Sequence, residues 1–142
     1  MDFCESLVSE RITGLNEADF QKIKDIFAAV CDETASDLEA RAGFEYGMGH
    51  VTHTFNAMSS ARRRGIYREA GLLEFALSQP EIVCELIADG HHVSPTLMKM
   101  LYRAKGSQKI CLITDATAGA GLPVGKEFSL GGRTCVVDDG IC

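Results

Sequence analysis

The stretch "SPTLMKMLYRAKGSQKICLITDAT" (residues 94–117) decides the fold class. Ser94, followed at once by a proline, is typical of a helix start, because serine caps the first turn and proline needs no partner for an N–H there. Gly106 predicts the end of this helix. The run 109–117 is apolar up to Asp115, as in strands that are buried on both faces. The stretch therefore predicts a helix packed beside a parallel sheet.

The same alternation of strand and helix continues toward the N-terminus. The predicted strands are 28–34, 49–56, 82–90 and 109–117, and the predicted helices are 17–27, 35–47, 68–79 and 94–106. Asn16 and Ser36 are the expected N-caps of the first two helices. Strands this apolar have no wet face, so the pattern predicts an α/β fold with four parallel strands covered by helices. Two short alternating runs, 126–130 and 133–137, predict the start of a small β-structure.

The composition limits the class of protein. The chain has 142 residues, 46% of them hydrophobic and 24% charged, as expected of one soluble domain. A net charge of −6 argues against a nucleic-acid partner, and we interpret the basic run 62–64 as a solvated loop. No apolar run reaches the roughly 18 residues of a membrane span, and the acidic residues 1–10 do not resemble a signal peptide.

The six cysteines indicate the compartment. None belongs to a CxxC pair, and several lie in apolar runs, where cysteine acts as a small hydrophobe. We therefore expect reduced thiols and a cytoplasmic location. The cysteines are Cys4, Cys31, Cys84, Cys111, Cys135 and Cys142.

Residues able to do chemistry follow every predicted strand. The carboxyl ends of parallel strands lie at one edge of a sheet, where sites are commonly built. We therefore expect one shared site at this edge. The residues concerned are Asp32 and Glu33, His53 and Asn56, Asp89 with His91 and His92, and Asp115.

Each of these residues also has a purely structural interpretation. Asp115 could be a general base or could cap a turn, and we favour catalysis because His53 is expected one strand away. His53 could bind a divalent metal or be a core histidine bonded to backbone. His50 is expected on the opposite face of its strand, and we assign it no role.

Two interpretations are also open for the histidine pair 91–92, nearly equal on spacing alone, and for Arg68, where a surface residue is the more frequent case. Adjacent side chains diverge, so at most one of His91 and His92 enters a site, and both could lie in a solvated turn. Arg68 could hold an anion through two hydrogen bonds or be a surface residue.

Several motifs together resemble the N-acetylglucosamine-6-phosphate deacetylases of the amidohydrolase superfamily. The resemblance covers roughly residues 35–142, and the combination of "THxFNAM", "DGxHV" and "TDA" is far more specific than any one of them. The matching stretches are "VTHTFNAM" (51–58), "YREAG" (67–71), "ELIADGHHV" (85–93), "LYRAKG" (101–106), "ICLITDAT" (110–117), "FSLGG" (128–132) and "VVDDG" (136–140).

The resemblance implies a fold and an activity. The family has a TIM-like β/α barrel and a small β-sandwich, so residues 1–118 would form roughly half a barrel and 119–142 the start of the sandwich. The family hydrolyses the acetamide of N-acetylglucosamine 6-phosphate to glucosamine 6-phosphate and acetate. A metal-activated water attacks the carbonyl, and an aspartate takes and returns its proton.

The resemblance also implies roles for residues that match the motifs. Asp115 would be the catalytic acid/base, and His53 a metal ligand. Asn56 and Ala57 would contact the substrate phosphate, and His92 the sugar.

Arg68 matches a family arginine that reaches the phosphate across a dimer interface, which implies a homodimer in the full-length protein. Ala70 stands where the family motif has proline.

Two departures from the family pattern concern the metal. Asp32, with Glu33 as the less favoured neighbour, stands where the family has a histidine ligand; a carboxylate still suits zinc, iron or manganese. The family's "EGP" glutamate ligand has no counterpart in this sequence. We therefore expect the chain to be a fragment that is weakly active or inactive alone.

Two alternatives remain open. The chain could be a non-catalytic remnant that binds a phosphosugar or dimerises through open sheet edges. It could also belong to an amidohydrolase that acts on a different amide, because fold and metal chemistry are shared across many reactions.

Overall fold

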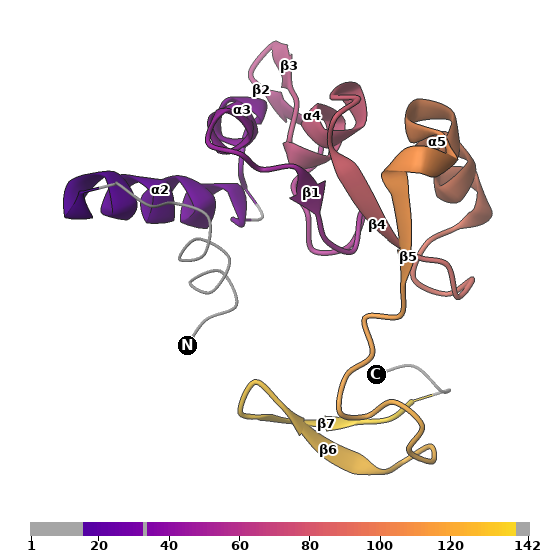
Figure 1. Cartoon of the computed structure of the whole chain (residues 1–142). Helices are drawn as coiled ribbons and strands as arrows, with labels where there is room; N and C mark the ends of the chain where they lie inside the picture. Colours follow the sequence, from indigo (N-terminus) through magenta and orange to yellow (C-terminus); the bar gives the residue numbers. More distant parts are fainter. Residues whose placement is uncertain (1–15, 33, 139–142) are drawn as a thin grey trace.

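The computed structural model describes residues 16–32 and 34–138, as a series of short α/β units (Figure 1). The helices are α2 (Glu17–Val30), α3 (Asp37–Glu45), α4 (Leu72–Ser78), α5 (Pro95–Lys105) and the 3-10 turn η1 (Ser107–Lys109). The strands are β1 (His50–Val51), β2 (Arg62–Arg64), β3 (Tyr67–Glu69), β4 (Val83–Ile87), β5 (Ile110–Ile113), β6 (Glu127–Leu130) and β7 (Arg133–Val136).

A parallel sheet of three strands, in the order β1-β4-β5, is the centre of the fold. Val51 pairs with Cys84, and Cys84 in turn pairs with Ile110. Each crossover between neighbouring strands contains a helix, α4 before β4 and α5 before β5. The expected α/β class with a parallel sheet is therefore confirmed, with three strands among the described residues instead of four.

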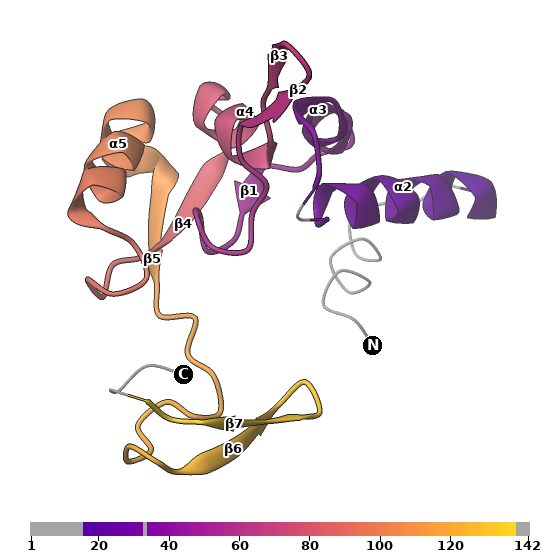
Figure 2. The same ribbon diagram turned by 180° about the vertical axis from the view of Figure 1, so that it is seen from behind.

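The core lies between one face of the sheet and helices α4 and α5. Cys84 and Leu86 of β4 contribute to the same buried cluster as Phe75 of α4 and Leu101 of α5. Figures 1 and 2 show both helices beside this sheet from opposite views. Burial of these apolar side chains is the main force that holds the strands in register.

The predicted strand at 28–34 is wrong. Residues up to Val30 continue α2, and Asp32 belongs to a turn after the helix. Alanine favours helix and no breaker precedes Val30, so Ile23 and Val30 lie on one helical stripe, both buried. A short apolar run of this kind does not distinguish strand from helix by itself.

Helix ends follow the local signals closely. The Asn16 side chain accepts a hydrogen bond from the Asp19 amide, and Ser36 and Glu39 form a capping box at the start of α3. Ser94 caps α5, which ends at Gly106 with a φ of 63°.

An antiparallel hairpin, β2–β3, replaces the loop expected at 62–64 and the first turn of the helix expected at 68–79. Glu69 forms ion pairs with Arg62 and Arg64, at 2.9 and 3.1 Å, across this hairpin. Helix α4 begins only after Gly71, whose amide donates to the Glu74 carboxylate. The cross-strand charge pairing outweighs the helical periodicity that the sequence shows here.

The second hairpin, β6–β7, has the antiparallel pairing that the alternating runs predicted. Among the described residues, no helix is long and apolar enough to cross a membrane. Cys84, Cys111 and Cys135 carry free thiols, as expected. The predictions about residues 1–10, Cys4 and Cys142 lie outside the described residues.

Candidate active site

His53 lies just after β1, and its ring is fixed by backbone groups. Its Nδ1 is 3.0 Å from the carbonyl oxygen of Asn56, and the Asn56 amide donates to the His53 carbonyl at 2.9 Å. A carbonyl oxygen only accepts, so Nδ1 carries the proton and the neutral ring keeps its lone pair on Nε2. His53 therefore presents Nε2 as the nitrogen available for a metal ion or a substrate.

The backbone around His53 is strained. His53, Phe55 and Ala57 have φ values of 31°, 81° and 43°, in the left-handed region that side chains other than glycine rarely adopt. Alternate left-handed residues fold the segment 53–57 tightly back on itself. Strain of this kind persists only where surrounding contacts hold the segment, and it is concentrated at functional sites.

Asp89 organises the turn that follows β4. Its Oδ1 accepts from the amides of His91 and His92 at 2.9 and 3.0 Å, and its Oδ2 is 2.6 Å from Nδ1 of His92. These hydrogen bonds, first those from the two amides, hold the pKa of Asp89 well below its usual range. The carboxylate thereby fixes the His92 ring and leaves Nε2 as its outer nitrogen.

Asp115 follows β5, the strand next to β4. It is exposed, with a φ of 50° that turns the chain sharply away from the strand. Because the sheet order is β1-β4-β5 and all pairs are parallel, His53, His92 and Asp115 follow three neighbouring strands at the same edge.

Asp32 has a different setting, in the turn after α2. Its Oδ1 accepts from the hydroxyl and the amide of Thr34, at 2.6 and 2.7 Å. These two bonds, the hydroxyl's first, lower its pKa. Glu33 lies outside the described residues. Within 16–32 and 34–138, no group of three or more His, Cys, Asp or Glu side chains is placed to share a metal ion.

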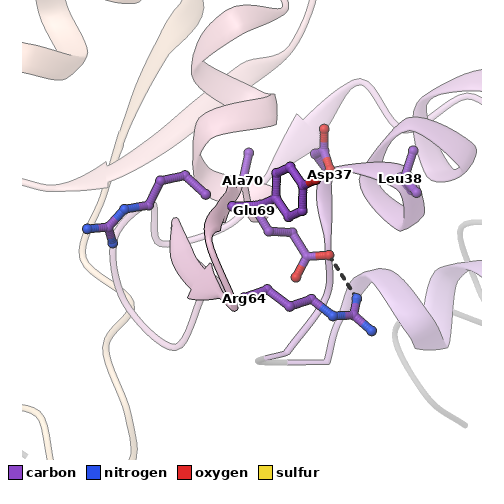
Figure 3. Close-up of a pocket in the computed structure, with 7 residues that line it drawn as sticks. Asp37, Leu38, Arg64, Glu69 and Ala70 are labelled. Atoms are coloured by element: carbon purple, nitrogen blue, oxygen red, sulfur yellow. Dashed lines mark hydrogen bonds and ion pairs between the residues drawn. The ribbon is translucent and has the colours of Figure 1, made fainter.

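Arg68 lies on the β2–β3 hairpin, directly opposite Arg63. Alternation along the strand places its side chain on the face away from Glu69, so it is outside the ion pairs that Glu69 makes with Arg62 and Arg64. An open hollow of about 570 Å³ lies here, and Figure 3 shows the Arg64–Glu69 ion pair beside it. Its lining residues are Asp37, Leu38, Arg64, Tyr67, Arg68, Glu69 and Ala70. Arg68 is therefore the one predicted site residue that lines this hollow.

Sequence reasoning passed over Glu85, which contacts the segment that carries His53. The Thr52 hydroxyl donates to its Oε2 at 2.7 Å, and Nε2 of His50 is 3.1 Å from its Oε1. The sequence does contain a signal for this residue: Glu85 is an acidic residue inside an otherwise apolar strand, where a carboxylate needs hydrogen-bond partners.

Comparison with known proteins identifies relatives of this chain. No protein-family model matches the chain. An N-acetylglucosamine-6-phosphate deacetylase of Bacillus subtilis is 40% identical over 100 residues, which is 66% of this chain and 24% of that protein. A solved deacetylase from Mycobacterium smegmatis, in complex with N-acetyl-D-glucosamine-6-phosphate, superimposes with a TM-score of 0.67 at 31% identity. The chain is related to the N-acetylglucosamine-6-phosphate deacetylases.

Other deacetylases give the same result. The solved Thermotoga maritima deacetylase matches 74% of this chain and 28% of its own, with a TM-score of 0.66 and 30% identity. An N-acetylgalactosamine-6-phosphate deacetylase of Escherichia coli is 29% identical over 96% of this chain and 34% of its own length. The chain thus spans about a quarter to a third of these four deacetylases, and the resemblance stated from the motifs is confirmed.

Proposed function

We propose that this chain carries the strand-end part of an active site that hydrolyses the acetamide of N-acetylglucosamine 6-phosphate, in the cytoplasm, to glucosamine 6-phosphate and acetate. One observation carries the proposal: His53, the Asp89–His92 pair and Asp115 follow three neighbouring parallel strands at one edge. The similarity to deacetylases over most of the chain supports this reaction class.

Asp115 is the proton carrier of the proposed reaction. Its exposed carboxylate accepts a proton from the attacking water as the water oxygen bonds to the acetamide carbon. The same carboxyl returns the proton to the nitrogen as the C–N bond breaks, so that a neutral amine and acetic acid leave. The acetic acid then loses its proton to water and becomes acetate. A charge on the carbonyl oxygen develops between these steps and needs nearby donors or a cation.

His92 is the proposed sugar contact. Asp89 holds Nδ1, so Nε2 is free to accept a hydrogen bond from a hydroxyl of the sugar. A carboxylate-oriented ring loses little freedom when the ligand binds, which favours selective recognition.

The phosphate contacts are Asn56, Ala57 and Arg68. Asn56 and Ala57 belong to the strained turn beside His53, whereas Arg68 lies on the hairpin at a separate hollow. This separation favours Arg68 acting on the phosphate in a second copy of the chain, in a homodimer. Arginine suits the task because its planar guanidinium binds phosphate through two hydrogen bonds.

The described residues alone do not fit a divalent metal ion. His53 is a suitable single ligand, since its Nδ1 is bonded to a carbonyl and Nε2 is open. Asp32 is engaged by Thr34, and no third ligand is grouped with it in the described residues. A zinc, iron or manganese ion would therefore need ligands from outside these residues, and no step above is routed through it.

The proposed domain division is residues 1–118 as part of a β/α barrel and 119–142 as the start of a β-sandwich. The parallel β1-β4-β5 sheet and the separate β6–β7 hairpin favour this division.

A chimera tests the function. Residues 35–142 replace the matching segment of the Bacillus subtilis deacetylase, and acetate release from N-acetylglucosamine 6-phosphate is measured. We expect activity that Asp115→Asn and His53→Ala reduce by at least roughly a hundredfold, as is common for acid–base groups. Asp138→Asn is the matched control, because Asp138 is an exposed aspartate outside the parallel β1-β4-β5 sheet. Equal activity in Asp115→Asn and Asp138→Asn would contradict the proposal.

A non-catalytic phosphosugar-binding remnant is the second candidate. It is favoured by the lack of a grouped ligand set in 16–32 and 34–138. Calorimetric titration of the 142-residue chain with N-acetylglucosamine 6-phosphate, with and without a chelator, separates the two. An affinity for N-acetylglucosamine 6-phosphate that is the same with and without the chelator, together with an inactive chimera, favours the non-catalytic remnant.

A further inference from the structure

Glu85 contacts three residues of the segment that carries His53. Its Oε1 is 3.1 Å from Nε2 of His50, and its Oε2 accepts from the Thr52 hydroxyl at 2.7 Å. Its backbone carbonyl accepts from the Thr54 amide at 2.8 Å. One residue of β4 therefore binds residues 50, 52 and 54, on both sides of His53.

The side-chain contacts lie on the face of the sheet away from the core. Cys84 and Leu86 point to the buried cluster, so the Glu85 side chain between them points the other way. It remains only 23% exposed, which strengthens its hydrogen bonds relative to those on an open surface. A partly buried carboxylate without hydrogen-bond partners would destabilise the strand. The contacts with His50 and Thr52 remove this cost.

The segment it holds is the strained one. Regular pairing between β1 and β4 ends at Val51 and Cys84, so residues 52–57 are not held by regular strand pairing with β4. The left-handed φ values of His53, Phe55 and Ala57 must be maintained by other contacts. Glu85 supplies such contacts to Thr52 and Thr54 from the neighbouring strand β4.

We propose that Glu85 is a positioning residue for His53. By holding His50 and Thr52 with its carboxylate, it fixes the direction in which the chain leaves β1, and hence the Nδ1 contact with the Asn56 carbonyl that leaves Nε2 free. The effect of Glu85 on catalysis rests on the proposed function. Its effect on the orientation of the His53 ring does not depend on that function.

Nitrogen NMR of the histidine rings tests the proposal on the full 142-residue chain, at alkaline pH where imidazoles are neutral. The ring of His53 should show a protonated Nδ1 and an unprotonated Nε2. In Glu85→Ala we expect this pattern to change toward the mixture of tautomers seen in a free imidazole, with faster exchange of the Thr54 amide. Glu85→Gln keeps an acceptor for Thr52 and should restore most of the wild-type pattern.

Two further variants make the result specific. Thr52→Val removes the hydrogen bond from the Thr52 hydroxyl to Glu85 and leaves Glu85 in place. It should change the His53 ring signals in the same direction as Glu85→Ala, but less. It also serves as the test variant if Glu85→Ala does not fold. Glu127→Ala, on the separate strand β6, is the matched control and should leave the His53 ring unchanged. Wild-type ring signals in both Glu85→Ala and Thr52→Val would overturn the proposal.

The result separates this inference from the proposed function. If the chimera is inactive but the His53 ring responds to Glu85, the positioning holds and the deacetylase proposal fails. If the chimera is active, Glu85→Ala in it should lower kcat more than it raises KM, because a misdirected histidine affects the reacting groups more than remote binding contacts.

Discussion

Asp89 and His92 form a side-chain pair at 2.6 Å, three residues apart in the turn after β4. The same carboxylate accepts from the amides of His91 and His92. Asp89 thus shapes the turn and orients the ring with a single side chain. Gly90, with a φ of 82°, allows the turn to close between them.

Asp89→Asn is expected to release the His92 ring while keeping much of the turn. The amide oxygen of asparagine still accepts from backbone, but its NH₂ group cannot accept the proton of Nδ1. Ring-nitrogen NMR should show His92 losing its fixed Nδ1-protonated form. Asp138→Asn is the control, and an unchanged His92 ring in Asp89→Asn would contradict this role.

The turn should also respond to acid. The pKa of Asp89 is lowered by the hydrogen bonds it accepts, first from the His92 and His91 amides. Its contribution to stability is therefore complete above the ordinary aspartate pKa of about 3.9 and is lost as the pH falls below that toward the folded pKa. The free energy of unfolding of the wild-type chain, minus that of Asp89→Asn, should therefore not shrink until the pH falls below about 4. A difference that already shrinks above this pH would contradict the assignment.

Gly71→Ala is expected to destabilise the fold by about 1–3 kcal/mol, as overpacking does. A Cβ at this position would lie 2.6 Å from the Ser59 carbonyl carbon and 2.7 Å from the Ser60 amide nitrogen. The Ser59 backbone is itself bonded to Leu73, at 3.0 Å, and cannot move cheaply. Chemical denaturation measures the loss.

Gly49→Ala is the matched control for Gly71. The nearest atom to its added Cβ is the Gly47 carbonyl oxygen at 4.0 Å, so there is space for the methyl group. Equal denaturation midpoints for the two variants would show that the close approach at Gly71 is relieved in solution.

Leu101→Ala is expected to cost about 2–5 kcal/mol in the free energy of unfolding, because it leaves a cavity in the core. Leu101 is fully buried, at 0% exposure, whereas Leu38 is 70% exposed. Leu38→Ala should therefore change the unfolding free energy by no more than about 0.5 kcal/mol. Urea titrations of both variants test where the core lies.

The purified 142-residue chain is expected to release little or no acetate from N-acetylglucosamine 6-phosphate, with or without added zinc, iron or manganese. The physical reason is that the described residues group no three metal-ligating side chains. Robust metal-dependent release by the chain alone would contradict this expectation.

Residue patterns were informative where structure depends on near neighbours. Asn16, Ser36 and Ser94 were expected to cap helices and do so. The parallel strands β4 and β5 lie within the runs predicted for them. The expectation that the second of these runs is buried on both faces was wrong, because β5 has a neighbouring strand only on the β4 side in the described residues and exposes Cys111 and Leu112.

The same reasoning failed where neighbours in space competed with neighbours in sequence. Residues 28–30 extend α2, since alanine and valine fit either state and the packing of α2 against α3 decided for the helix. Residues 67–69 form a strand because Glu69 pairs with two arginines across a hairpin. In both places the local preference is weak, and contacts made elsewhere decide it.

The sequence by itself determined the α/β class, the N-caps of α2, α3 and α5, and the residues that follow β1, β4 and β5, because these depend on hydrogen bonds and periodicity within a few residues. The tertiary structure alone decided that Asp32 belongs to a helix-end turn, that Arg68 lies on a hairpin beside a separate hollow, and that Glu85 holds the segment around His53. The Asp32 turn and the β2–β3 hairpin are local structures, but their residues fit more than one local state, so packing and charge pairing decided between them. Glu85 and Thr52 lie 33 residues apart in the chain, so their contact depends on the tertiary structure.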